Sequence, residues 1–131
     1  MIDHIGLPVE NYEKSKAFYE KALAPLGITI VMEVTPEMHG GEDSACGFGI
    51  GSKPFFWIGG GKVSGDHMHV AFDADSRKRV DAFYKAAIAA GGRDNGAPGL
   101  RPHYHKDYYG AFVLDPDGHN IEAVCHKPEP Y

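Results

Sequence analysis

The sequence predicts an α+β fold in which tandem βαβββ repeats form a curved mixed sheet, with a helix packed on each half. Two observations support this prediction: the chain repeats itself at an offset of 65 positions, and strand-like and helix-like patterns alternate within each copy. The stretch KSKAFYEKALAPLG (14–27) returns as RVDAFYKAAIAAGG (79–92), with the AFY core and the closing glycine in register. At the same offset His4 aligns with His69, so one supersecondary unit occurs twice.

The first repeat begins with a strand and continues into an amphipathic helix. The stretch IDHIGLPV (2–9) is strand-like, and Asn11 is a suitable N-cap for a helix over 12–24. Gly27 can end this helix because glycine adopts the left-handed conformation at little cost. Further strands are predicted near 28–34, 45–51 and 54–58.

The second repeat has the same pattern. A strand over 67–74 precedes a helix over 76–90, whose apolar residues again fall on one face. Between the last strands, DPDG (115–118) has the composition of a tight turn, and we expect the adjacent His119 to be exposed. These last strands are predicted near 109–114 and 120–126.

Length, charge and cysteine usage favour one small domain without nucleic-acid or membrane partners. We expect a single domain over 1–131, with repeat one at about 1–59 and repeat two at about 66–131. The net charge of −5, with one basic cluster at 77–79, argues against DNA or RNA as a partner. The chain has no signal peptide pattern and no long apolar run, and its two cysteines are far apart. We therefore expect a cytoplasmic protein with reduced, buried thiols.

Two histidines occupy matching places in the repeats. His4 and His69 are each the third residue of an opening strand, so a pseudo-twofold axis would bring their side chains together. Two converging imidazoles make half of a metal site, although a single strand histidine is more often a hydrogen-bonded core residue. His67 is a rival ligand on the same strand face, but the repeat register favours His69.

A carboxylate lies in the middle of the last predicted strand. Glu122 stands between apolar residues in HNIEAVCH, and burying an unpaired carboxylate is prohibitively costly. It must therefore either face water from an edge strand or be paired, and coordination of a metal ion is one form of pairing.

The opening DH strand, HVAF (69–72) and LDPDGHNIE (114–122), within a tandem βαβββ repeat, together resemble the vicinal oxygen chelate superfamily. That superfamily includes glyoxalase I, bleomycin-resistance proteins, fosfomycin-resistance enzymes and extradiol dioxygenases. The resemblance covers nearly the whole chain. It implies that His4, His69 and Glu122 are ligands of one divalent metal ion, namely Zn, Ni, Mn or Fe.

The chain departs from the glyoxalase I pattern at one position. The resemblance implies a fourth ligand, a glutamate, in the last strand of the first repeat, but that strand contains FFWI (55–58). The matching position is Phe56 or Trp57, and neither side chain binds a metal. Both are instead predicted to form walls of a substrate cavity. Superfamily dioxygenases are commonly about twice this length, which counts against that activity.

The Gly-, Pro- and His-rich segments 35–44 and 93–108 are predicted to be irregular loops over a site. The stretch 99–110 is dense in polar and aromatic groups. We expect His105 first and Tyr109 second to act as acid or base, together with Glu122. Two cations of this loop are predicted to bind an anionic substrate: Arg101 and Lys106.

The function predicted first is that of a metal-dependent, glyoxalase-like lyase or isomerase acting on a small substrate held through vicinal oxygens. Two alternatives remain: a metal-free protein that sequesters an antibiotic, as bleomycin-resistance proteins do, and a thiol transferase of the fosfomycin-resistance type. A homodimer is expected in each case, because the repeats leave sheet edges open.

Overall fold

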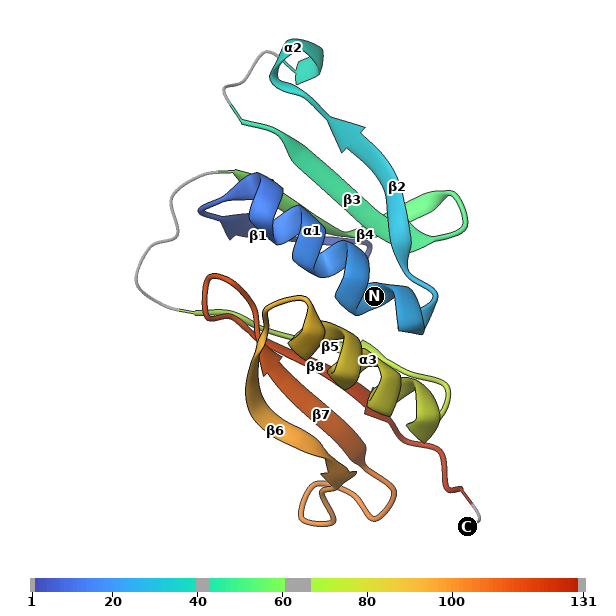
Figure 1. Cartoon of the computed structure of the whole chain (residues 1–131). Helices are drawn as coiled ribbons and strands as arrows, with labels where there is room; N and C mark the ends of the chain where they lie inside the picture. Colours follow the sequence, from blue (N-terminus) through green and yellow to red (C-terminus); the bar gives the residue numbers. More distant parts are fainter. Residues whose placement is uncertain (1, 40–42, 61–66, 130–131) are drawn as a thin grey trace.

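The computed structural model describes residues 2–39, 43–60 and 67–129, which form two four-stranded mixed sheets (Figure 1). The strand order is β1-β4-β3-β2 in one sheet and β5-β8-β7-β6 in the other. The tandem βαβββ prediction is confirmed. The strands are β1 (Ile5–Val9), β2 (Thr29–Val34), β3 (Ala45–Ile50), β4 (Lys53–Gly60), β5 (His69–Asp73), β6 (Arg93–Leu100), β7 (Tyr109–Leu114) and β8 (Asn120–Cys125).

The long helices begin and end as the sequence predicts. In α1 (Tyr12–Leu23), the Asn11 side chain accepts a hydrogen bond from the backbone N–H of Lys14 at 3.1 Å. A 3-10 turn, η1 (Ala24–Leu26), follows and ends at Gly27, whose φ of 79° is in the left-handed region. The helix α3 (Arg77–Ala89) has the same kind of N-cap, formed by the side chain of Ser76. None of the helices among the described residues is both long and apolar enough to cross a membrane.

The two sheets have matching registers. The opening strand of each repeat pairs in parallel with the closing strand of the same repeat, β1 with β4 and β5 with β8. Gly6 pairs with Trp57 in the first sheet, and Ala71 pairs with Glu122 in the second. Trp57 therefore occupies the position in the first repeat that Glu122 occupies in the second.

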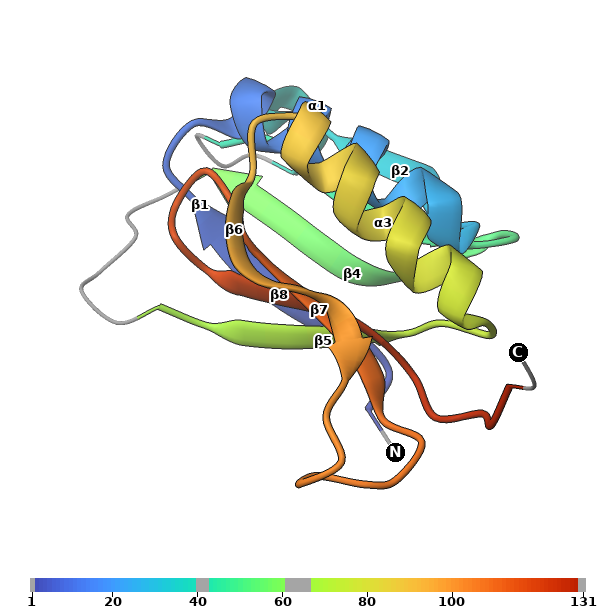
Figure 2. The same cartoon turned by 60° about the horizontal axis from the view of Figure 1, so that its bottom comes forward.

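Both repeats contribute to one hydrophobic core between the helices and the sheets. Figure 2 shows α1 and α3 together on one side of the strands. Phe56 of β4 meets Phe72 of β5 edge to face, with ring centroids 5.1 Å apart. The backbone at Gly92 lies so close to α1 that a Cβ there would be 2.9 Å from Phe18 Cε1. The helix of the first repeat is thus packed against the second.

Two segments predicted to be irregular contain regular structure. The first half of 93–108 forms β6, over Arg93–Leu100, and a short helix, α2 (Pro36–His39), lies within 35–44. The β6 sequence RDNGAPGL has no alternation of apolar and polar residues, and its pairing with β7 is interrupted around Gly96 and again before Gly99. An interrupted strand of small and polar residues has no period-2 pattern, so the sequence prediction was wrong here.

Two residues of the turn between β7 and β8, Asp115 and His119, are buried, and the prediction that His119 is exposed was wrong. Only 1% of His119 is exposed, because its Nδ1 accepts a hydrogen bond from the backbone N–H of Met68 at 2.9 Å. The turn chemistry itself is confirmed. Gly118 has a φ of 86°, and its N–H donates to the carbonyl of Asp115.

Candidate metal and substrate site

His69 and Glu122 lie side by side on the neighbouring strands β5 and β8. The Nε2 atom of His69 is 3.2 Å from Oε1 of Glu122. The Nδ1 atom of His69 lies 2.9 Å from the backbone carbonyl of Asn120. A carbonyl only accepts, so Nδ1 carries the proton, and in the neutral ring Nε2 directs a lone pair toward the carboxylate. The lone pair of Nε2 and a lone pair of the carboxylate oxygen repel each other unless a proton or a metal ion lies between them.

The carboxylate of Glu122 is buried and held on its other side. Only 2% of Glu122 is exposed, which means that its charge requires partners. The hydroxyl of Tyr108 donates a hydrogen bond to Oε2. Burial of the phenol, followed by this hydrogen bond, raises the pKa of Tyr108 above its ordinary value. Tyr108 therefore keeps its proton, and Oε1 of Glu122 remains directed toward His69.

A cavity of about 400 Å³ opens beside this pair, and its walls are largely aromatic. The ring of Phe112 stacks on the His69 imidazole, with centroids 6.3 Å apart. Tyr104 meets Tyr108 edge to face at 5.0 Å. A small ligand in this cavity would contact both the imidazole–carboxylate pair and apolar ring faces. The lining residues are His69, Tyr104, Tyr108, Phe112, Asn120 and Glu122.

His4 lies apart from this pair within one chain. It precedes β1, with 59% of its side chain exposed, and its Nδ1 is 2.8 Å from Oδ1 of Asp3. It borders a different cavity, of about 430 Å³, which shares no lining residue with the one at His69. Within the described parts of the chain, His4 does not join His69 and Glu122 in a group of three close ligand atoms.

Apart from His69 and Glu122, the predicted site residues lie outside the lining of the His69 cavity. The hydroxyl of Tyr109 donates to Asp81 of α3 at 2.6 Å, so this side chain lies on the helix face of the sheet. Burial and that hydrogen bond raise the pKa of Tyr109 to about 12. His105 accepts from the N–H of Asp107 within its own exposed loop. Neither Tyr109 nor His105 lines the His69 cavity.

Tyr108 is the functional residue that sequence reasoning missed. Neighbouring residues at the start of a strand point to opposite faces, so Tyr108 and Tyr109 cannot both reach the cavity. Phe112 lines the cavity, and an even spacing separates it from Tyr108 but not from Tyr109. The alternation along β7 was the signal that could have favoured Tyr108.

The predicted substrate-binding residues do not line the His69 cavity either. Phe56 is fully buried in the core, whereas Trp57 is half-buried on the opposite face of β4. Arg101 lies over the ring of Phe112 at 5.5 Å and donates to two backbone carbonyls of β6. Lys106 is exposed in the loop before β7 and does not line the His69 cavity.

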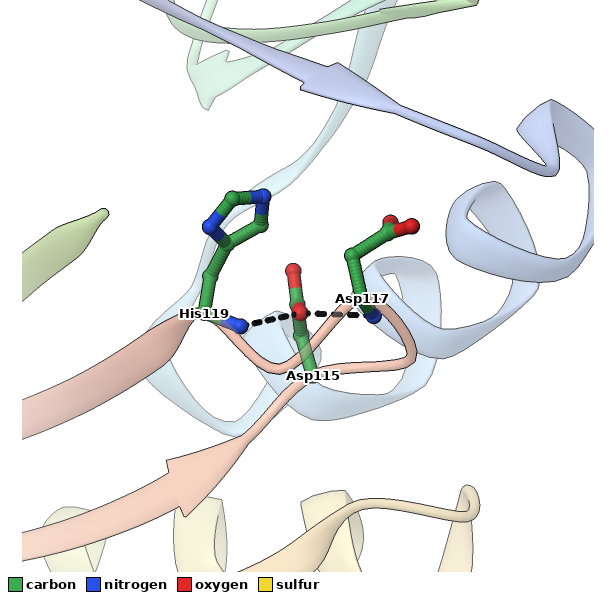
Figure 3. A group of neighbouring side chains, drawn as sticks. All are labelled: Asp115, Asp117 and His119. Atoms are coloured by element: carbon green, nitrogen blue, oxygen red, sulfur yellow. Dashed lines mark hydrogen bonds between the residues drawn. The ribbon is translucent and has the colours of Figure 1, made fainter. Parts of the chain in front are cut away.

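A second group of candidate ligands lies in the turn between β7 and β8 (Figure 3). Asp115, Asp117 and His119 place ligand atoms within 4.8 Å of one another, so this group could hold a metal ion. Its atoms already have structural roles, however. Asp115 accepts hydrogen bonds from the N–H groups of residues 117 and 119 and from the hydroxyl of Tyr19. Nδ1 of His119 accepts a hydrogen bond from the backbone N–H of Met68. In the neutral ring the proton is therefore on Nε2, and a protonated nitrogen has no lone pair for a metal ion.

Comparisons with known proteins agree with this fold. The profile of the Glyoxalase/Bleomycin resistance protein/Dioxygenase superfamily matches residues 1–123. No curated protein matches the chain. A solved glyoxalase/bleomycin resistance protein from Albidiferax ferrireducens is 30% identical, with a TM-score of 0.70 over 96% of this chain and 98% of that one.

Two solved structures with more specific names share the fold at lower identity. Glyoxalase I from Zea mays is 21% identical, with a TM-score of 0.68 over 95% of this chain and 45% of that one. A mutant of the fosfomycin resistance protein FosX from Listeria monocytogenes, crystallised with Mn(II) and a dihydroxypropylphosphonic acid, is 18% identical. Its TM-score is 0.67, over 95% of this chain and 88% of that one. The chain belongs to the glyoxalase/bleomycin resistance protein/dioxygenase superfamily.

Proposed function

We propose that the protein is a metal-dependent enzyme that binds one divalent ion through His69 and Glu122 and acts on a small substrate held through vicinal oxygens. One observation carries the proposal. With the His69 proton on Nδ1, the free nitrogen faces a buried carboxylate oxygen at 3.2 Å. A separation of this size suits two ligands that each lie about 2.0–2.2 Å from one ion. The hydrogen bond to the Asn120 carbonyl is the support that metal-binding histidines usually have.

The third ligand in this proposal is His4 of a second copy. Within one chain His4 borders a separate cavity, yet it occupies the repeat position of His69. The strands β1 and β5 are each at the edge of a sheet, so a twofold partner can place its β1 beside β5. A homodimer would then contain two equivalent sites, each with two histidines and one glutamate.

In the bound state the ion would act as a Lewis acid on the vicinal oxygens of the substrate. The residues of this chain would hold the coordinating carboxylate in position. The hydrogen bond from Tyr108 fixes Oε2 of Glu122 and leaves Oε1 as the coordinating oxygen. Tyr108 lines the cavity, and its one hydroxyl proton is donated to Glu122, so its role would be to hold this carboxylate in place beside the ion. A glyoxalase-like lyase or isomerase reaction requires these functions.

We also propose that residues 1–131 act as one domain in the cytoplasm. The shared core, in which Phe56 meets Phe72, supports the first part. Two free, buried cysteines, Cys46 and Cys125, support a reducing compartment.

Metal analysis of two variants mixed together tests both the ligand set and the second copy. His4→Ala and His69→Ala should each lose the metal that wild-type protein retains on purification without chelator, as measured by plasma mass spectrometry. When the two variants are unfolded and refolded together, mixed dimers should regain one intact site, or roughly a quarter of all sites. Metal in wild type without recovery in the mixture would place all ligands in one chain. A wild-type protein that binds no Mn²⁺, Zn²⁺, Ni²⁺ or Fe²⁺ would refute the metal proposal.

The aromatic walls favour one second candidate, a metal-free protein that sequesters an antibiotic. Tyr104, Tyr108 and Phe112 together offer ring faces, and the net charge of −5 suits a cationic ligand. A calorimetric titration of the apoprotein with metal-free bleomycin distinguishes the candidates. Tight binding that is unchanged in His69→Ala would support sequestration, and absence of heat would exclude bleomycin as the ligand.

A further inference from the structure

The face of the first sheet turned away from α1 carries an indole at the position where the second sheet carries its carboxylate. Gly6 pairs with Trp57 as Ala71 pairs with Glu122, and the two pairs are related by the repeat offset. Side chains of paired residues lie on the same face of a sheet. Trp57 is therefore on the same face as His4, which precedes Gly6 by two residues.

A glycine on the neighbouring strand allows the indole to lie against the sheet. Gly47 of β3 pairs with Trp57, and a Cβ at this glycine would be 2.9 Å from Cε2 and Cζ2 of the indole. Real Cβ atoms do not approach so closely, so the ring packs directly over the β3 backbone. The matching position in the second repeat is Phe112, whose ring faces Glu122 across the strand pair. The two sheets thus differ in shape as well as in charge.

The indole borders a shallow hollow of about 290 Å³. The other residues around the hollow are uncharged and carry no polar side chain, so it offers no side-chain ligand to a metal and no partner to an ionic group. An exposed apolar face beside a flat ring best accommodates another flat ring. The residues that define the hollow are Gly6, Leu7, Pro8, Ala45, Trp57, Ile58, Gly59 and Gly60.

We propose that the substrate carries an aromatic ring next to its chelating oxygens, and that this ring stacks on Trp57. The inference rests on the proposed function, because it takes His4 as the ligand that brings this face to the metal site. The wall on the other side, formed by Tyr104, Tyr108 and Phe112, is aromatic too. A planar, apolar group attached to the vicinal oxygens would therefore contact ring faces from both repeats.

Two α-hydroxy acids that differ only in the attached group test this proposal. Mandelate and lactate offer the same vicinal oxygens, but mandelate carries a phenyl ring where lactate carries a methyl group. Binding of each to the Mn²⁺-loaded protein is measured by calorimetry. We expect mandelate to bind about tenfold more tightly to wild type, a preference that corresponds to ring stacking plus apolar burial. Trp57 is the only tryptophan, so mandelate should also change the intrinsic fluorescence, whereas lactate should not.

Variants at the indole complete the test. Trp57→Ala should lose most of the preference for mandelate, and Trp57→Phe, which keeps a smaller ring, should retain about a threefold preference. Tyr84→Phe, on α3, serves as a control that leaves the preference unchanged.

Equal binding of the two acids to wild type, or an undiminished preference in Trp57→Ala, would overturn the stacking proposal while chelation stands. If neither acid binds the metal-loaded protein, vicinal-oxygen chelation fails as well. A third outcome would also overturn the proposal: wild type shows no preference for mandelate, and the Trp57→Ala dimer dissociates. The hollow would then be a contact between two copies of the chain.

Discussion

The two repeats have the same strand order and register but present different chemistry on their open faces. In the first, the face beside β1 carries Gly6 and Trp57 and offers an apolar surface. In the second, the face beside β5 carries His69 and Glu122, and a tyrosine hydroxyl holds the carboxylate. The backbone arrangement is thus the same in both repeats, while single side chains at matching positions make one open face charged and the other apolar.

The turns that close the two sheets differ as well. Ile50, at the turn between β3 and β4, is 63% exposed, whereas Asp115, at the same position in the second repeat, is buried and accepts three hydrogen bonds. One of these comes from Tyr19 of α1, so the second turn also stabilises the packing between the repeats. The burial of that tyrosine, next to the carboxylate of Asp115, raises its pKa well above the ordinary value.

The largest expected effects are in the hydrophobic core, where matched substitutions in the two repeats should lower stability by similar amounts. Phe18 and Phe83 occupy matching positions and are both buried. Phe18→Ala and Phe83→Ala should each lower the free energy of unfolding by about 3–5 kcal/mol, since each leaves a cavity in one shared core. Urea unfolding followed by Trp57 fluorescence and by far-UV circular dichroism should give coincident transitions in both variants. Separate transitions would show that the repeats unfold independently.

The turns should respond unequally. Asp115→Ala leaves buried donors without an acceptor and should cost about 2–3 kcal/mol of stability, as measured by thermal or urea unfolding. Ile50→Ala is the matched control in the first repeat and should change stability by less than about 0.5 kcal/mol, because this side chain is mostly exposed. Equal costs would mean that the hydrogen bonds at Asp115 add nothing to the turn.

A carboxylate at the position of Trp57 should make the open faces more alike. Trp57→Glu would place an acidic group beside His4, at the register position of Glu122. We expect the affinity for Mn²⁺, measured by competition with a chromophoric chelator, to rise by about tenfold. Trp57→Gln has nearly the same shape without the charge and should show no gain. A gain in both variants, or in neither, would contradict a metal site next to this position.

The smallest expected effect is on the pH dependence of stability and comes from Tyr109. The matching position in the first repeat is Ser44, which has no phenol to titrate. The folded-state pKa of Tyr109, about 12, lies above the ordinary value of 10.0, so its protonated form is favoured by folding. This contribution is complete below pH 10 and is lost as the pH rises from 10 through about 12. Between those values the stability of Tyr109→Phe should therefore fall less steeply than that of wild type in urea unfolding series. Parallel curves would show that the hydrogen bond to Asp81 does not favour the protonated phenol.

Much of the fold was predictable because periodicity and caps are local. The helices and their glycine ends follow from a local pattern that occurs twice without a gap, whereas the parallel pairing of opening and closing strands was not predicted. The strand β6 was not predictable from pattern, because Gly96 and Gly99 interrupt its pairing and its side chains do not alternate. Its position is determined by the partner strand β7.

The candidate site was predictable to a smaller extent. Matching positions indicated His69, and a buried carboxylate in an apolar strand indicated Glu122; the structure places these two in contact. The choice between Tyr108 and Tyr109 requires the alternation along β7 to be counted back from Phe112, and the three-dimensional structure shows that Phe112 lines the cavity. The separation of His4 from the other two is likewise set by how the repeats pack against each other.

The turn after β7 has a consequence for how the chain folds during synthesis. Asp117 accepts hydrogen bonds from the N–H of Glu10 and from the hydroxyl of Ser15, and Asp115 accepts one from Tyr19. These contacts join residues about a hundred positions apart, so the native packing of α1 has a high contact order. On the ribosome, α1 remains without these partners until residues 115–117 have left the exit tunnel. Until then, the part of α1 that faces the second repeat is available to chaperones or to other nascent chains, whereas Tyr19 can already pack on Phe56 of β4.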